Sequence, residues 1–311
     1  MYLIFKWYYL FFCADSVDEI VDEIDKCHRE LKCDRTATEI NAQQRYMFLV
    51  ESTLGLCWHI GIAMFLILAM TQPVWTKNKL PFHCIHPFNW HDPERHPLAH
   101  IISYIWQCLV LTYNMISILY MELLSSHIFT QLGCNLKILC LEFQGLTKLS
   151  RNNEELFRRE LYRSVEFHQR ILSLVDRTNR VFYAPMIMQM IASFLMISLS
   201  TFVSLVARHE PSVAARFVIF MVLSFLHLSY WCIAGDMVTE HSQKVAHAAY
   251  EVYEWLPYKP EVQRDVMFVI QRAQLPLSMV ASPFPPFNLF SYMSILKQCY
   301  TILTVLLESL D

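Results

Sequence analysis

The chain has 311 residues, of which 55% are hydrophobic and 17% are charged, and its net charge is −3. Ordinary soluble domains carry about 25% charged residues, so this composition and a mean hydropathy of +0.30 predict a membrane protein. The charge balance offers no basic face of the kind that nucleic-acid binding requires, so no nucleic-acid partner is predicted. Five glycines and long apolar runs favour a bundle of α-helices over a membrane β-barrel.

The chain opens with an apolar, aromatic stretch, MYLIFKWYYLFFC, at residues 1–13. A membrane-spanning helix needs about 20 apolar residues, and this stretch is shorter. It also lacks the small-residue cleavage site of a secretory signal peptide. We therefore predict that it is half of a spanning helix, with further residues upstream of it in the complete protein.

Five longer apolar stretches are predicted to span a membrane, at 48–71, 100–124, 181–206, 214–235 and 287–307. Their orientation follows from Lys and Arg, which favour the cytoplasmic side of a membrane. The segments 14–46, 126–180 and 237–275 hold 18 of these residues, whereas 72–99 and 207–213 hold four. The first three segments are therefore predicted to be cytoplasmic, and the last span runs outward and leaves Asp311 outside.

The segment 126–180 is predicted to be helical. Its apolar residues Leu136, Leu139, Phe143 and Leu146 recur at helical spacing. The span at 100–124 is therefore expected to continue as a helix below the membrane, with its charged residues on a solvated face.

The segment before the last span, QLPLSMVASPFPPFNLF, is predicted to interrupt a helix. Its four prolines, Pro276, Pro283, Pro285 and Pro286, each remove a backbone hydrogen-bond donor. A cytoplasmic helix near 260–275, within 237–275, should end at this interruption, and a separate membrane helix should begin near Phe287. The last helix is therefore predicted to be broken.

The C-terminal half carries several motifs in a fixed order. YWCIAGDMVTEHSQKVAHAAYEVYEW contains Cys232, Gly235, Asp236, Ser242, Val245, Ala249, Tyr250 and Trp255. IQRAQLPLSMVA contains Arg272, Ala273, Gln274 and Pro276, and LKQCYTILTVLL contains Lys297, Tyr300, Thr301 and Thr304. In order and spacing these motifs resemble those of insect odorant receptors. LPFHCIHPF at 80–88, with Gln107 in the next span, is similar to that family's second extracellular loop and fourth helix.

The resemblance implies one transmembrane domain over residues 1–311, an all-α polytopic bundle of inverted seven-helix topology. The five spans correspond to its helices three to seven, and residues 1–13 to part of its second helix. The long cytoplasmic insertion of the family's shared co-receptor is missing, so the chain resembles an odour-specific tuning subunit. Such a subunit binds a small volatile odorant and gates a non-selective cation channel as a hetero-oligomer with the co-receptor, expected to be a tetramer.

The last predicted span carries a polar stripe. Ser294, Lys297, Thr301, Thr304 and Glu308 fall close to one face of a helix. The resemblance implies that this face lines the pore, that Val305 is a hydrophobic gate, and that Glu308 and Ser309 lie at the outer mouth. The alternative is that the threonines hydrogen-bond within a packed bundle while Lys297 and Glu308 snorkel or pair, or that Lys297 faces a neighbouring subunit.

The resemblance also places an odorant pocket in the outer half of the bundle, where aromatic and apolar side chains suit small volatile molecules. The candidate residues share faces of three spans: Trp58, Ile62 and Phe65; Tyr104, Cys108 and Thr112; and Phe217, Phe220 and Met221. The alternative for each residue is an ordinary packing role between helices.

Other motifs give little support for chemistry. The loop HCIHPFNWHDPERHPLAH holds His83, Cys84, His86, His91, Asp92, His96 and His100, but their spacing fits no standard closed zinc site, and a polar or pH-sensitive loop is the alternative. The sequence has no Gly-rich phosphate loop, HExxH or Gly-x-Ser-x-Gly motif, so neither an enzyme nor a cofactor is predicted. Asp236 and Glu240 are interpreted as a solvated helix end rather than an acid pair.

The sequence therefore predicts an odorant receptor subunit in the plasma membrane of an olfactory sensory neuron dendrite, surrounded by lipid, with an extracellular C-terminus. Three alternatives stay open: a gustatory receptor of the same superfamily, a secondary transporter, and a truncated receptor without function. A proline-broken helix suits a transporter, but the sequence has no internal repeat to accompany it. Loss of the first span would remove pocket walls, which keeps the third alternative open.

Overall fold

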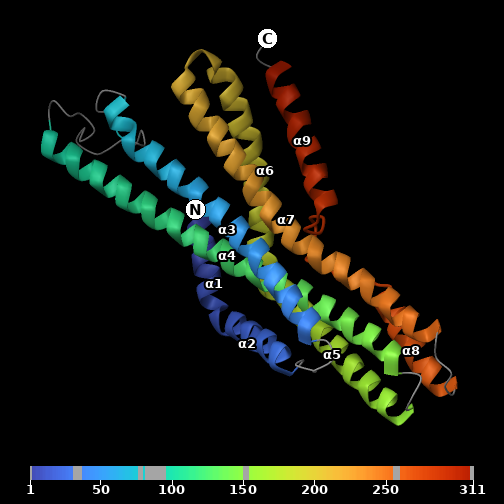
Figure 1. Cartoon of the computed structure of the whole chain (residues 1–311). Helices are drawn as coiled ribbons and strands as arrows, with labels where there is room; N and C mark the ends of the chain where they lie inside the picture. Colours follow the sequence, from blue (N-terminus) through green and yellow to red (C-terminus); the bar gives the residue numbers. More distant parts are fainter. Residues whose placement is uncertain are drawn as a thin grey trace.

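A computed structural model describes residues 2–30, 37–75, 80, 96–149, 154–254 and 260–308, and nearly all of them are helical (Figure 1). The elements are α1 (Tyr2–Phe12), α2 (Ala14–Glu30), α3 (Ala37–Trp75), α4 (Pro97–Leu149), α5 (Glu154–Val181), α6 (Tyr183–Val206), the 3₁₀-helix η2 (Ala207–His209), α7 (Pro211–Glu254), α8 (Pro260–Ala273) and α9 (Leu289–Glu308). The predicted all-helical fold is confirmed.

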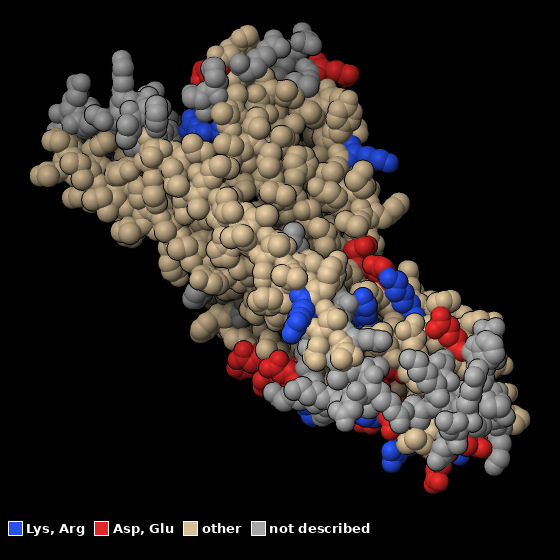
Figure 2. All heavy atoms as spheres, in the orientation of Figure 1, with Lys and Arg blue, Asp and Glu red and all other residues tan. Residues whose placement is uncertain are grey.

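Five of these helices contain segments that are long and apolar enough to cross a membrane: Phe48–Thr71 in α3, Pro97–Leu146 in α4, Tyr183–Val206 in α6, Val213–Tyr253 in α7 and Leu289–Leu306 in α9. Each segment overlaps one of the predicted spans. On the face shown in Figure 2, Lys, Arg, Asp and Glu gather mainly at the end formed by α5, α8 and the C-terminal part of α7. The helices above them form a broad belt with almost no charge.

The uncharged belt exposes large apolar side chains to its surroundings. Leu109 and Tyr113 of α4 and Leu199 of α6 are each more than half exposed. Contiguous apolar surface of this extent is unfavourable in water and suits the hydrocarbon of a lipid bilayer. The belt therefore fits a multi-pass membrane protein.

Below the belt, a second layer of helices packs around the continuation of α4. Leu136, Leu139, Phe143 and Leu146 of α4 are at most 2% exposed, because α2, α5 and α7 cover this helix. In Figure 1 the long helices α4 and α7 run through both layers and cross near the middle of the molecule. A shared core thus joins the apolar belt to the charged end.

The proline-rich segment between α8 and α9 is irregular over residues 274–288, which confirms the predicted break in the last helix. Neighbouring side chains satisfy its backbone groups. Asn179 of α5 donates to the Ser278 carbonyl at 3.0 Å and accepts from the Val280 amide at 3.1 Å. The Ser242 hydroxyl of α7 accepts from the Leu277 amide at 2.8 Å. These contacts hold the segment against α5 and α7.

Asp236 has a definite partner, which corrects its interpretation as a solvated helix end. Its carboxylate lies 3.4 Å from the backbone nitrogen of Leu289, the first residue of α9. Asn288 completes the cap, because its side-chain oxygen accepts from the Ser291 amide at 2.7 Å. A carboxylate at a helix N-terminus also complements the helix dipole, so α7 fixes the start of α9.

His168 lies on the buried face of α5, outside the spanning segments, with 5% of its surface exposed. Burial, with a smaller contribution from the Arg272 charge, lowers the pKa of this imidazole to about 4. As the pH falls, His168 is therefore protonated near pH 6.5 in the unfolded chain but only near pH 4 in the folded chain. The neutral His168 ring therefore makes its full contribution to the free energy of unfolding above pH 6.5. This contribution decreases as the pH falls from 6.5 to 4.

We expect the free energy of unfolding to fall by about 2 kcal/mol on this account between pH 7 and pH 5. Thermal unfolding of the detergent-solubilised protein at both pH values measures the change. The variant His168→Gln carries no titrating ring and should show a flatter pH dependence. The same slope in both proteins would contradict the assignment of the loss to His168.

Candidate functional site

The predicted pocket residues lie on α3, α4 and α7, and the structure brings several of them together. The ring centroids of Phe65 on α3 and Phe220 on α7 are 5.9 Å apart. The Tyr104 hydroxyl of α4 donates to the Met70 carbonyl of α3 at 2.8 Å. Ile62 is buried between helices. These contacts place the three predicted faces around one region of the bundle.

The other pocket candidates are partly covered. Trp58, Cys108, Phe217 and Met221 are half-buried. The Thr112 hydroxyl donates to the Cys108 carbonyl one turn earlier at 2.8 Å, so it is satisfied within α4. The Thr112 hydroxyl therefore does not offer its proton to a ligand in this arrangement. Among the described candidates, apolar contact dominates.

Gly61 allows a close approach of α3 to α7 in the same region. A Cβ built on Gly61 would lie 2.5 Å from Cδ2 of Leu223, a flexible side-chain end. A methyl group at this position would therefore have to displace the Leu223 side chain.

A buried polar cluster, formed by Lys6, Glu122, Gln189, His227 and Trp231, lies next to this region. Lys6 of α1 and Trp231 of α7 both donate to the Glu122 carboxylate of α4. His227 Nε2 lies 3.0 Å from Glu122 Oε2, and Gln189 of α6 accepts from Lys6 at 3.1 Å. The Glu122 side chain is fully buried. Residues of α1 and α7 thus meet the α4 carboxylate inside the apolar belt, and Gln189 of α6 joins the cluster through Lys6.

Sequence reasoning missed this cluster, although a signal was present. Lys6 and Glu122 are isolated charges within apolar runs. Such residues in a membrane segment are costly unless paired and commonly mark functional positions. The two residues are 116 positions apart, so their pairing required the fold.

The cluster is connected by ring contacts to the pocket candidates and to the base of α9. Trp58 of α3 stacks on His227 with ring centroids 5.1 Å apart. On the other side, the Trp231 ring lies 5.6 Å from the ring of Phe287, two residues before α9. Lys6 also lies over the Trp231 ring at 5.0 Å.

Helix α9 has two different faces. Ser291, Ile295, Cys299 and Leu303 are buried, and α9 packs against α6 and α7. The predicted pore residues Thr301, Thr304, Val305 and Glu308, with Lys297, lie toward the opposite side, and Ser294 flanks the buried face. Val305 is 59% exposed. Of the polar stripe, Lys297, Thr301 and Glu308 are exposed, whereas Ser294 and Thr304 are half-buried.

The hydroxyl groups of the stripe are satisfied locally. Thr301 donates to the Lys297 carbonyl at 3.0 Å, and Thr304 donates to the Thr301 carbonyl at 2.8 Å. Each oxygen can still accept a hydrogen bond from water. Predicted site residues Ser309 and Trp255 lie outside the described residues, as do His83, Cys84, His86, His91 and Asp92 of the histidine-rich loop.

The remaining motif residues divide into buried and exposed groups. Cys232 and Gly235 are buried on α7. Exposed on this single chain are Tyr250, Arg272, Gln274, Pro276, Lys297 and Tyr300.

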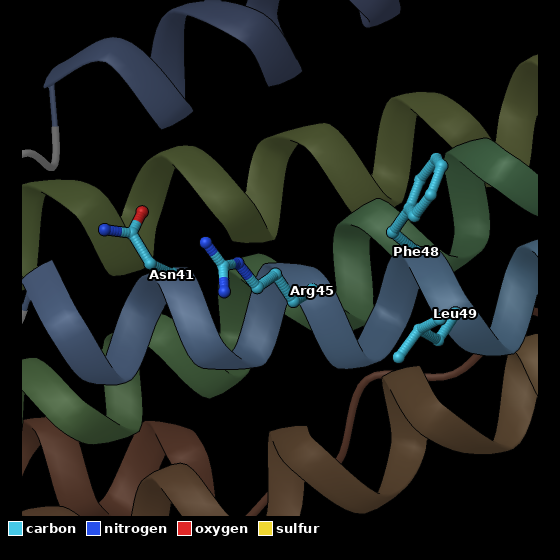
Figure 3. Close-up of a pocket in the computed structure, with 4 residues that line it drawn as sticks. All are labelled: Asn41, Arg45, Phe48 and Leu49. Carbon is cyan, nitrogen blue, oxygen red and sulfur yellow. The ribbon is translucent and has the colours of Figure 1, made fainter.

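An open cavity of about 610 Å³ lies along the N-terminal part of α3, lined by Asn41, Arg45, Phe48 and Leu49. Figure 3 shows these four side chains on successive turns of α3, beside the neighbouring helices. The four residues are exposed. The cavity lies more than two turns along α3 from Trp58 and Phe65, so it does not coincide with the predicted pocket.

The family model described as 7tm Odorant receptor matches residues 1–300 of the chain. The chain belongs to the odorant receptor family. It is 38% identical over its whole length to odorant receptor 47b and 37% identical to putative odorant receptor 65b of Drosophila melanogaster, covering 76% of each. It is 40% identical to odorant receptor 65a of the same species over 96% of its length, covering 72% of that receptor.

Solved structures support the fold of this odorant receptor. The insect olfactory receptor OR5 from Machilis hrabei superimposes with a TM-score of 0.76 at 14% identity, over 98% of this chain and 79% of that one. The same receptor in complex with eugenol superimposes with a TM-score of 0.72 at 18% identity, over 88% and 69%. As a member of this family, the chain is a receptor and not an enzyme, as predicted.

Proposed function

We propose that this odorant receptor is an odour-specific subunit that binds a small volatile ligand and gates a non-selective cation channel together with the family's co-receptor. The observation that carries the proposal is the exposed side of α9, where Lys297, Thr301 and Glu308 lie outside the packing of this subunit. Hydroxyl and carboxylate groups are energetically costly when they face lipid, whereas a water-filled pore shared between subunits solvates them. The face lies opposite the residues that attach α9 to α6.

Exposed apolar residues support assembly with other subunits. Tyr250, Met267, Phe268 and Leu275 are each more than half exposed on α7, α8 and the segment that follows. They lie at the charged end of the molecule, beyond the apolar belt, where lipid does not cover them. Apolar side chains of this size are favoured at the centres of protein interfaces, so we propose that they contact a neighbouring subunit.

The proposed orientation places the charged end in the cytoplasm of the sensory neuron. The excess of Lys and Arg in 126–180 supports this assignment. In Figure 1 the last turn of α9 lies at the end of the molecule opposite α8, which supports an extracellular position for the C-terminus. The ligand pocket then lies among α3, α4 and α7 in the half of the belt nearer the outside.

The pore proposal predicts that Val305→Ala and Glu308→Gln alter conduction. Val305→Ala shortens the side chain that forms the proposed dewetting gate and so widens the constriction. Leak current without odorant should therefore rise about threefold or more. Glu308→Gln removes a negative charge at the outer mouth and should lower selectivity for divalent over monovalent cations. Patch-clamp recording of the complete receptor with the co-receptor measures both quantities.

Matched controls use the same substitutions elsewhere. Val222→Ala changes an exposed valine on α7, and Glu210→Gln changes an exposed glutamate between η2 and α7. Neither should alter conduction. Odorant currents that need the chain but ignore Val305→Ala and Glu308→Gln would remove α9 from the pore and leave ligand binding in place. No current from the wild-type pair would refute the receptor proposal.

A further inference from the structure

The Glu122 carboxylate occupies a junction between two aromatic contacts. One of its oxygens, Oε2, lies 3.0 Å from His227 Nε2 and also accepts from the Trp231 indole. Its other oxygen pairs with Lys6. The same oxygen atom is therefore shared by a residue that faces the pocket candidates and a residue that faces the base of α9.

The pocket side of the junction is the contact between His227 and Trp58. Their rings stack at 5.1 Å, and Trp58 lies on the face of α3 that also carries Ile62 and Phe65. A ligand that displaces or orders these α3 side chains changes the surface against which the His227 ring rests.

The pore side of the junction is the contact between Trp231 and Phe287. Their rings lie 5.6 Å apart, and Phe287 is fully buried at the end of the irregular segment. The Phe287 amide donates to the Met279 carbonyl at 2.9 Å. Asp236, on α7 like Trp231, caps α9 at Leu289, two residues after Phe287. A change in the tilt of Trp231 is therefore applied directly at the start of α9.

The physical link between the two sides is the cost of an unpaired charge in a membrane. A buried carboxylate cannot release one donor without another taking its place, because no bulk water is available there. Movement of His227 away from Oε2 must therefore be accompanied by an adjustment of Trp231 or Lys6. Such a shared acceptor favours a small number of discrete arrangements over continuous adjustment.

We propose that Glu122, through the oxygen it shares between His227 and Trp231, is the positioning residue that couples occupancy of the pocket to the position of α9. This inference rests on the proposed function. Glu122 touches neither ligand nor pore; it fixes how the two aromatic contacts respond to each other.

A double-mutant cycle between Trp58 and Trp231 tests the coupling. Trp58→Leu removes the stack on His227, and Trp231→Phe removes the indole donor while keeping a ring against Phe287. The complete receptor and co-receptor are exposed to a fixed panel of volatile probes that includes eugenol, and the half-activating concentration of the active probe is measured. Currents are normalised to surface-labelled receptor.

We expect the effect of the double variant to differ from the product of the single effects by about fivefold or more, since residues joined through one hydrogen-bond network couple at this level. The control Phe129→Leu disturbs another ring contact of Trp231, at 5.4 Å, without touching the carboxylate. Its effect should multiply with that of Trp58→Leu. If Trp58→Leu with Trp231→Phe fails to reach the surface, His227→Asn replaces Trp58→Leu under the same criterion.

Independent effects in the main cycle, multiplying within about twofold, would overturn the coupling role. Equal coupling for the Phe129→Leu control would overturn it as well, because general loosening of the bundle would then explain the result. A response of the wild-type receptor to the panel tests the proposed function itself. Failure of the function is thus seen in the wild type, and failure of the coupling in the cycle.

Discussion

Replacing Gly235 by alanine is expected to destabilise the fold by about 3 kcal/mol or more. A Cβ at this position would lie 2.2 Å from the Phe287 carbonyl oxygen and 3.1 Å from its carbonyl carbon, both backbone atoms. The Phe287 backbone cannot move aside easily, because its amide bonds to Met279 and its ring is fully buried. Fluorescence-detected size-exclusion chromatography after heating measures the loss.

Gly145 provides the matched control for this substitution. It also lies within a helix, but a Cβ added there would meet no atom within 4 Å. Gly145→Ala should therefore stabilise α4 by about 0.5–1 kcal/mol through the lower backbone entropy of the unfolded chain. Equal melting temperatures for the two variants would show that α7 and the segment before α9 are less closely packed than described.

Replacing Glu122 by alanine is expected to lower stability by about 3–5 kcal/mol, because Lys6 would then be a buried charge without its carboxylate. The indole of Trp231 would also lose its acceptor. The paired substitution Lys6→Met with Glu122→Gln removes both charges and keeps an acceptor for Trp231. It should therefore retain most of the stability that the single variant loses.

Melting temperatures of the purified variants show whether the loss of stability comes from the broken ion pair or from the smaller side chain. The exposed pair Glu240 and Lys244, one helical turn apart on α7, serves as the control. Glu240→Ala should change stability by less than about 0.5 kcal/mol, since water solvates the remaining lysine. If Glu122→Ala melts like Glu240→Ala, the buried pair does not hold the bundle together.

The sequence was sufficient for those features that depend on local patterns. Apolar length predicted the membrane segments, and the prolines from Pro276 to Pro286 predicted the break before α9. Features that depend on distant residues required the structure. Lys6, Glu122 and His227 each appear as a lone polar residue in an apolar run, and nothing local to any of them identifies its partners. Asp236 was misinterpreted for the same reason, because its partner lies 53 positions away.

The two faces of α9 fall between these cases. Helical periodicity grouped Lys297, Thr301, Thr304 and Glu308 on one side, but the sequence could not distinguish a packed side from an open one. Burial of Ile295 and Leu303 settles which side contacts α6. The pocket candidates remain a prediction, since aromatic residues at helical spacing serve packing and ligand contact equally well.

The lengths of α4 and α7 give the molecule an uneven stiffness. These helices have 53 and 44 residues without interruption and extend roughly 80 and 65 Å. The membrane end and the charged end of each helix therefore tilt together as one rigid element. Helix α9 starts after an irregular stretch instead, anchored at its base by Asp236. Its direction is therefore set by side-chain contacts at its base and along α6 and α7, whereas the direction of each long helix is set by its own continuous backbone.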